Sequence, residues 1–573
     1  MAQAADGIAS ALEQLNERVR ELECRVAVLE SQTETPPVSQ PQSPALALEQ
    51  PAATWRGFPS AVLPDGAVPV VGRAVLGIAG AYLLRAIAES RAVPQLPVLV
   101  VAIVYAAMWM VWAARDRATS RFASVTYGIT SAMILSPLLW ESTVRFRVLS
   151  PAFAAVVLVA FVVLALALGW RRNLQSIPWV AVLATVSICL ALIIGTRELV
   201  PLTAALLVTA VAVEMVVCLG HRLSVRALPA LAADFALWLL VLVMTSPEGV
   251  PEGYHPVSSV TITLLCLALL AIYGGSIGAR SFGLRRQITF FEIGQGILVF
   301  ALASYGSLRA TQGLLAPALG VLFLLLAAVC YWGALRRFVE EAYTRNRRVS
   351  ATWAAALLLG GSSLVLPVMF RVPFLCLAAV AAAFVYTRTL KFSLGLHASF
   401  YLAAAAAASP LPIYAANALA GTVPGTPALT VWAVVISAVV CYVVASSGDR
   451  DRGKRRLLWV APAALVGFAG TAMAIAALVW LLGGRVELNP SRLAVVRTMV
   501  NCALALGFGF LAPRWKRAEL GWVAYTAVAF GTLKLLFEDL RFGNAASLVV
   551  SLLFYGLVLI LLPRWTRRGQ TTF

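Results

Sequence analysis

The sequence predicts an all-α integral membrane protein with about 18 transmembrane helices and an N-terminal cytoplasmic coiled coil. Composition is the first reason: 61% of the 573 residues are hydrophobic and 12% are charged, whereas soluble domains are about 45–50% apolar and about 25% charged. Pattern is the second reason, because apolar runs of about 20 residues, long enough to cross a bilayer as a helix, alternate with short charged segments. A soluble multidomain enzyme is therefore excluded.

Residues 1–34 are the first element, a predicted coiled coil. Apolar residues recur there in alternating steps of four and three, the spacing of a left-handed coiled-coil seam. These residues are Ile8, Leu12, Leu15, Val19, Leu22, Val26 and Leu29. We expect a homo-oligomer through residues 8–29, or a cytoplasmic coiled-coil partner. The alternative is a lone amphipathic helix on the membrane, but such helices favour Lys and Arg on their polar face, and this segment has at least as many acids.

Residues 35–69 follow as a predicted flexible linker. Eight prolines interrupt this segment, with Ser and Gln between them. Such a composition cannot form a core and is typical of an extended tether.

Residues 70–563 are the predicted polytopic transmembrane domain. Breaks at clusters of charge, Gly and Pro separate eighteen candidate spans. They cover approximately 70–88, 94–114, 122–140, 149–169, 177–195, 199–219, 228–246, 256–277, 287–307, 313–334, 351–370, 372–388, 393–410, 427–446, 457–483, 491–511, 518–536 and 544–562.

The distribution of Lys and Arg predicts the orientation. The loops after even-numbered spans carry 28 of these residues and the loops after odd-numbered spans carry nine. Because positive residues remain on the cytoplasmic side, both termini are expected in the cytoplasm, including a basic tail over residues 564–573. The net charge of +19 thus reflects membrane orientation, and nucleic acid is not an expected partner, because the cations are scattered between apolar runs.

Three carboxylates within the spans are candidates for a polar intramembrane site. Glu214, Asp234 and Glu292 each lie roughly 8–9 Å inside the predicted cytoplasmic boundary, at about 1.5 Å per residue. Gln295 follows Glu292 by three residues and shares its helical face. An ionisable group costs several kcal/mol in this environment unless it is paired or faces water.

A second group of candidates lies toward the predicted external end. Arg497 and Asn501, four residues apart, share one helical face, and Lys534 lies near Glu538 and Asp539. Interhelical pairing, together with snorkelling of Lys534 and Arg85 to the interface, is the alternative to a functional site.

Cysteine and histidine provide no sign of a metal site or another cofactor. No CxxC motif occurs, and His221, His255 and His397 lack ligand-type neighbours at metal-binding spacing. Each histidine is expected to be solvated or interfacial. No catalytic residue is predicted, and no nucleotide-binding loop follows a strand.

The C-terminal hairpin is the segment LGWVAYTAVAFGTLKLLFEDLRFGNAASLVVSLLFYGLVLILL, residues 520–562, in which Lys534 is followed five residues later by Asp539. This hairpin resembles that of a bacterial family of predicted membrane proteins, the domain of unknown function 2339. The layout of coiled coil, Pro-rich tether and Gly-rich first span is also similar. The resemblance implies a short or divergent member located in the bacterial inner membrane, with Lys534 and Asp539 as positions of interest, and implies no particular activity.

Three function classes follow from these patterns. A transporter, channel or lipid-handling protein with a polar intramembrane site is the first expectation. A membrane scaffold assembled through the coiled coil is the alternative. A cell-envelope enzyme acting on lipid-linked sugars is a second alternative, since acids lie at the predicted external face.

Overall fold

The computed structural model divides the chain into two units, Met1–Leu63 and Pro64–Phe573. It describes residues 67–568 apart from 91–93, 116–120, 173, 221–222, 390–391, 421–424, 448–456, 484–489, 540 and 542–544. In the first unit it describes Glu17, Arg18 and Arg20, which are helical and exposed. The predicted coiled coil therefore lies almost wholly outside the described residues, as does the linker except for 67–69, which begin the first helix of the second unit.

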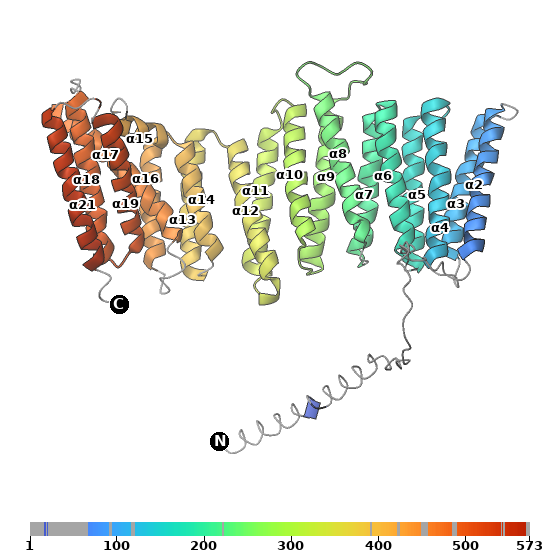
Figure 1. The fold of residues 1–573 in the computed structure, drawn as a ribbon, viewed down its shortest axis with the longest axis horizontal. Coiled ribbons are helices and arrows are strands. Elements are labelled where there is room, and N and C mark those ends of the chain that lie inside the picture. Colours follow the sequence, from blue (N-terminus) through green and yellow to red (C-terminus); the bar gives the residue numbers. More distant parts are fainter. Residues whose placement is uncertain are drawn as a thin grey trace, which may run out of the picture. The chain divides into compact units, whose positions relative to one another are not determined.

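The described residues of the second unit form helices and connecting turns, without strands (Figure 1). The helices of its first half are α2 (Ala67–Glu89), α3 (Gln95–Arg115), α4 (Arg121–Trp140), α5 (Pro151–Arg172), α6 (Ser176–Thr196), α7 (Leu199–Cys218), α8 (Ala227–Met244), α9 (Ser259–Gly278) and α10 (Phe290–Ala310). Those of its second half are α11 (Ala316–Trp332), α12 (Thr344–Val365), α13 (Val368–Thr389), α14 (Phe392–Ala408), α15 (Leu411–Ala420), α16 (Leu429–Ser447), α17 (Leu457–Gly483), α18 (Pro490–Arg514), α19 (Ala518–Lys534) and α21 (Ala545–Arg568).

Every predicted span overlaps one of these helices, but fewer than eighteen have the length and composition of a membrane span. Among the described residues 15 helices are long and apolar enough to cross a membrane, or 16 if the bent pair Ser393–Ala408 and Leu411–Ala420 is one span. The apolar part of α16, Leu429–Val444, is shorter. The remaining helix, α12, begins with a turn that contains three arginines, so its apolar segment is short.

The outer surfaces of the helices explain why these segments suit lipid. Large apolar side chains point away from the bundle along its whole length, including Leu76, Met215 and Trp480, which are 72%, 64% and 72% exposed. Water would strongly disfavour apolar surface of this extent. Helices that are apolar on all sides are typical of membrane spans, so the helices are suited to direct contact with a bilayer.

Apolar cores join neighbouring helices into successive groups. One core extends through α2–α10, a second joins α13, α14, α16 and α17, and a third joins α18, α19 and α21. The helices succeed one another broadly in chain order in Figure 1. Between the first two groups α11 and α12 pack as a close pair, because Gly320 and Gly361 bring their backbones together.

Four of the described helices end in a π-helical turn, and one pair of consecutive helices is sharply bent. The π turns are η1 (Glu141–Arg145) after α4, η3 (Ala279–Gly283) after α9, η4 (Gly333–Arg337) after α11 and η6 (Leu535–Asp539) after α19. Such turns are often found at functional positions, and each of these four carries charged residues. The break at Ser409 and Pro410 bends α14 and α15 by 67°, and α15 is a helix that the sequence pattern did not predict.

Candidate functional site

Four charged side chains, three of them buried and Arg280 partly buried, form a network where α7, α8, α9 and α10 meet. Arg226, the residue before α8, donates from Nε to Glu214 Oε1 at 2.5 Å and from Nη2 to Glu214 Oε2 at 2.7 Å. Its Nη1 donates to Glu292 Oε1 at 2.9 Å, and Arg280 on η3 also pairs with Glu292. Two acids and two bases are thus joined through bidentate, charge-assisted hydrogen bonds, and the network as a whole is electrically neutral.

Neighbouring side chains hold this network in place. The Ser276 hydroxyl on α9 donates to Glu214, and the Phe291 ring centroid lies 5.2 Å from the Arg226 guanidinium carbon. Thr289 and Glu292 form a capping box at the start of α10, in which Glu292 Oε2 accepts from the Thr289 backbone nitrogen at 2.7 Å. A carboxylate at this position is also favoured by the helix dipole.

The capping box places Glu292 at the start of its helix. Glu292 lies two residues after the start of α10 and Asp234 lies seven residues after the start of α8, which is about 3 Å and about 10 Å along the helices. The expectation that the three carboxylates share one depth in a membrane stays a prediction. The spacing from Thr289 to Glu292 is the sequence signal for a capping box, and it would have placed Glu292 at a helix start.

A second layer lies one helical turn from the network. Gln295 follows Glu292 by three residues on α10, and its Nε2 donates to Asp234 Oδ2 at 2.7 Å. Tyr273 precedes Ser276 by three residues on α9 and lies within electrostatic reach of Asp234 and Glu214. Residues three apart share a helical face, so this layer stacks directly on the charged network.

Asp234 is the carboxylate that differs from the others in this region. Its side chain is buried, with 4% of the residue exposed, yet no Lys, Arg or His pairs with it among the described residues. Its Oδ1 has no hydrogen-bond partner there, and neither does the hydroxyl of the buried Tyr273. A buried ionised carboxylate without a counter-charge is costly, so Asp234 is suited to hold a proton.

A second cluster joins α18, α19 and η6. Lys534 Nζ lies 2.5 Å from Asp539 Oδ1 and 3.4 Å from Glu538 Oε2, and it donates to Thr498 Oγ1 at 2.8 Å. The Thr498 hydroxyl in turn donates to Asp539 Oδ2 at 2.8 Å. Lys534 does not snorkel to the surface, because only 7% of it is exposed. Ion pairing between helices, the alternative to a functional site, therefore describes this cluster better than an open pathway does.

The π turn η6 explains how residues five apart meet. In a π helix hydrogen bonds connect residue i with residue i+5, so Lys534 and Asp539 face the same side. Regular α-helical spacing would bring together residues three or four apart, and the lysine would then contact Glu538 alone.

Arg497 caps the broken helix from the side. Its Nε and Nη2 donate to the carbonyl oxygens of Ala418 and Asn417 at 2.7 and 3.2 Å, which are among the last carbonyls of α15. Its Nη1 donates to Glu538 Oε1 at 2.6 Å. Asn501, one turn further along α18, donates to the Ala527 carbonyl of α19 at 2.9 Å. These bonds supply partners to backbone groups that hydrocarbon cannot satisfy.

The eight predicted site residues thus divide between two clusters that share no helix. Glu214, Asp234, Glu292 and Gln295 come together around Arg226, whereas Arg497, Lys534 and Asp539 come together around Glu538, with Asn501 beside them. The sequence pattern missed Arg226 and Arg280, because both were counted as loop cations.

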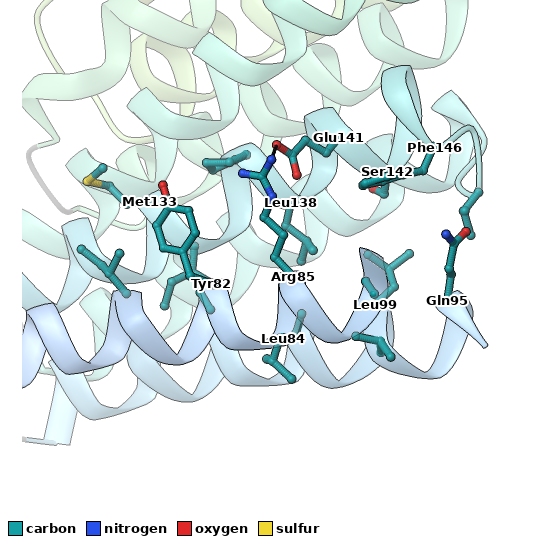
Figure 2. Close-up of a pocket in the computed structure, with 18 residues that line it drawn as sticks. Tyr82, Leu84, Arg85, Gln95, Leu99, Met133, Leu138, Glu141, Ser142 and Phe146 are labelled. Carbon is teal, nitrogen blue, oxygen red and sulfur yellow. Dashed lines mark ion pairs between the residues drawn. The ribbon is translucent and has the colours of Figure 1, made fainter. Parts of the chain in front are cut away.

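A separate cavity lies between α2, α3 and α4 (Figure 2). Arg85 is one of its lining residues and pairs with Glu141 on η1 at 2.9 Å and with Glu89 at 3.3 Å. The lining is otherwise mostly apolar, and Figure 2 shows the Arg85 guanidinium reaching toward the Glu141 carboxylate. This cavity was not expected from the sequence.

His397 corrects another expectation. It is 4% exposed and lies inside the bundle, where its Nδ1 is 3.0 Å from the Tyr331 hydroxyl. Tyr331 also bonds to the Tyr401 hydroxyl. The histidine is therefore a buried core residue between α11 and α14, not an interfacial one.

Comparison with known proteins found no counterpart. No family model, no curated protein and no solved structure matches the chain. Within the described part of the chain, no three His, Cys, Asp or Glu side chains gather closely enough to hold a metal ion. Function is therefore inferred from the two clusters and the α2–α4 cavity alone.

Proposed function

We propose that this protein is a membrane transporter in which Asp234 binds and releases a proton within a polar site formed by α7–α10. The observation that supports this proposal is the buried Asp234 carboxylate with no cationic partner and with Oδ1 unbonded among the described residues. Ionisable groups of this kind inside membrane spans commonly mark proton relays and substrate pathways.

The neighbours of Asp234 suit both protonation states. With a proton on Oδ1 the side chain is neutral and Oδ2 still accepts from Gln295. When the proton leaves, the carboxylate is stabilised by the Gln295 amide, and the cationic Arg226 lies one layer away. The Tyr273 hydroxyl is free to donate or accept as the proton moves. The neutral network beside this layer holds the site in place without itself changing charge.

Further polar groups on the same helices support a pathway that continues beyond Asp234. Thr203 and Thr263 lie near the starts of α7 and α9, at the opposite ends of these helices from Glu214 and Ser276. Both hydroxyls are buried without a hydrogen-bond partner among the described residues. They are positions where water or a moving proton would find partners.

Charge movement after a pH jump tests this function without knowledge of the cargo. The full-length protein is reconstituted on a solid-supported membrane, and the transient current that follows the jump is recorded. We expect a current with the wild type that is lost in Asp234→Asn. Glu519→Gln is the matched control, because Glu519 is equally buried on α19 but lies outside α7–α10, and its current should be unchanged. No wild-type current, or an unchanged current in Asp234→Asn, would contradict the proposal.

The topology forms part of the same proposal. We infer eighteen spans, with both termini in the cytoplasm and the chain in the bacterial inner membrane, as a short or divergent member of the domain of unknown function 2339 family. The excess of Lys and Arg in alternate loops supports this orientation, and the similar C-terminal hairpin supports the family. A reporter fused after Arg568 should be active in the cytoplasm, whereas activity outside would contradict an even number of spans.

A scaffold assembled through residues 8–29 is the second candidate function. The Lys534 cluster favours it, because the acids and bases there are paired with one another and satisfied by Thr498, as expected for a structural contact between helices. An enzyme acting on lipid-linked sugars has the least support, since Glu89 and Glu141 are engaged by Arg85.

A further inference from the structure

The cavity between α2, α3 and α4 combines a mostly apolar lining with two charged side chains, Arg85 and Glu141. Its volume is about 130 Å³. Ile78, Leu99 and Ala102 line it, and so do Tyr82 and Met133, whose exposed fractions of 62% and 56% show that the cavity reaches the surface. A hydrocarbon chain that reaches this cavity from the bilayer would be surrounded by apolar side chains.

The charged side chains around Arg85 include both cations and anions. Arg85 Nη2 pairs with Glu141 Oε1 at 2.9 Å, Arg85 Nε pairs with Glu89 at 3.3 Å, and Arg145 Nη1 lies 3.7 Å from Glu89. Two cations and two anions thus meet at the ends of α2 and α4. Arg85 Nη1 and Glu141 Oε2 take no part in these pairs, so a cationic hydrogen-bond donor and an anionic acceptor are left for a ligand.

We propose that this cavity binds one phospholipid whose headgroup carries both a phosphate and a primary ammonium, as in phosphatidylethanolamine. The phosphate accepts hydrogen bonds from Arg85, the ammonium donates to Glu141, and part of one acyl chain fills the apolar interior. Charge-assisted hydrogen bonds of both kinds are strong. Arg85 lies four residues before the end of α2, about 6 Å along the helix, which is close to the level where headgroups meet the hydrocarbon.

The same charges select against other common headgroups. An anionic headgroup, such as that of phosphatidylglycerol, has no ammonium group to pair with Glu141, and its negative charge would be repelled by this carboxylate. The quaternary ammonium of phosphatidylcholine has no N–H group, so it cannot donate to Glu141. The preference for a primary ammonium is therefore the distinguishing property of this site.

Lipid binding to the intact protein tests the proposal. The full chain is purified, exchanged into phosphatidylcholine nanodiscs that contain either phosphatidylethanolamine or phosphatidylglycerol, and the bound lipid is counted by native mass spectrometry. We expect one retained phosphatidylethanolamine. Glu141→Gln weakens one hydrogen bond to a charged group. It should therefore reduce the preference for phosphatidylethanolamine over phosphatidylcholine by about tenfold. Arg85→Gln should weaken the binding of phosphatidylethanolamine and phosphatidylcholine alike, since both carry the phosphate.

Two further variants keep the outcome interpretable. Arg309→Gln is the matched control, because Arg309 lies in the last turn of α10 and is exposed at a helix end away from the cavity; its lipid binding should equal that of the wild type. Ala102→Leu fills the interior and should displace the lipid while the melting temperature remains within a few degrees. Equal retention of all three lipids by the wild type would overturn the proposal, and so would an unchanged preference in Glu141→Gln.

Discussion

Arg226 and Glu214 are joined by two parallel hydrogen bonds of 2.5 and 2.7 Å, although the first residue precedes α8 and the second lies in the last turns of α7. The guanidinium fork matches the two carboxylate oxygens, and its remaining Nη1 extends to Glu292 at 2.9 Å. One arginine therefore connects three helices.

Loss of this arginine should be strongly destabilising. Arg226→Met leaves Glu214 and Glu292 buried, and among the described ion pairs only Glu292 keeps a cation, Arg280. Breaking a buried pair in this way costs roughly 3–5 kcal/mol. We expect a large loss of folded yield and of melting temperature. Arg285→Gln is the control, because Arg285 and Glu340 are exposed and 3.9 Å apart, and surface pairs contribute about 0–1 kcal/mol. Equal melting temperatures for both variants would show that the network is not structural.

Lys534 and Asp539 should behave as a structural pair. Lys534→Met and Asp539→Leu should each lower the free energy of unfolding by roughly 3–5 kcal/mol, because each leaves a buried charge unpaired. The double variant removes both charges, so its loss should be well below the sum of the two single losses. A double-mutant cycle on the melting transition measures this difference, and simple additivity would refute the pairing.

Adjacent glycines in α12 should respond differently to alanine. A Cβ at Gly361 would lie 2.8 Å from the Gly320 carbonyl oxygen, which is backbone and cannot move aside, whereas the nearest atom to a Cβ at Gly360 is 3.9 Å away. We expect Gly361→Ala to destabilise the protein by roughly 1–3 kcal/mol and Gly360→Ala to be neutral or slightly stabilising, since alanine favours a helix. The reverse order of melting temperatures would contradict the close contact of α11 with α12.

The coiled coil is tested by cross-linking in native membranes. Cysteine placed at Val19, a predicted seam position, should form a disulfide-linked dimer under mild oxidation, because seam residues of parallel strands face one another. The same substitution at Arg20, outside the predicted seam, is the control and should cross-link much less. A monomer in both cases would exclude self-association through residues 8–29.

The helices could be predicted from the sequence because their signal is strong and local. Apolar runs bounded by Arg and Pro coincide with α2–α11 within a few residues. The angle between α14 and α15 could not be predicted, although Pro410 and Pro412 lie at the break between them. Its 67° bend and the helix α15 depend on tertiary partners, in particular Arg497 at the carbonyls of Asn417 and Ala418.

The candidate site was predicted in part, and the missing part has a physical reason. Glu214, Asp234 and Glu292 stood out as ionisable groups among apolar residues, which is a property of the sequence. Arg226 and Arg280 did not stand out, because positive residues beside a span are ordinary in cytoplasmic loops. Their burial depends on how α8 and α9 pack, and packing between residues 66 positions apart, such as Arg226 and Glu292, leaves no local pattern.

The protonation of Asp234 is the central claim, and infrared spectroscopy measures it directly. The carbonyl stretch of a protonated carboxyl group is recorded in membranes as the pH is raised, with exchange into heavy water to identify it. We expect a wild-type band that disappears as the proton is lost, is absent from Asp234→Asn, and persists in Glu519→Gln. A wild-type spectrum identical to that of Asp234→Asn at every pH would contradict the protonation of Asp234.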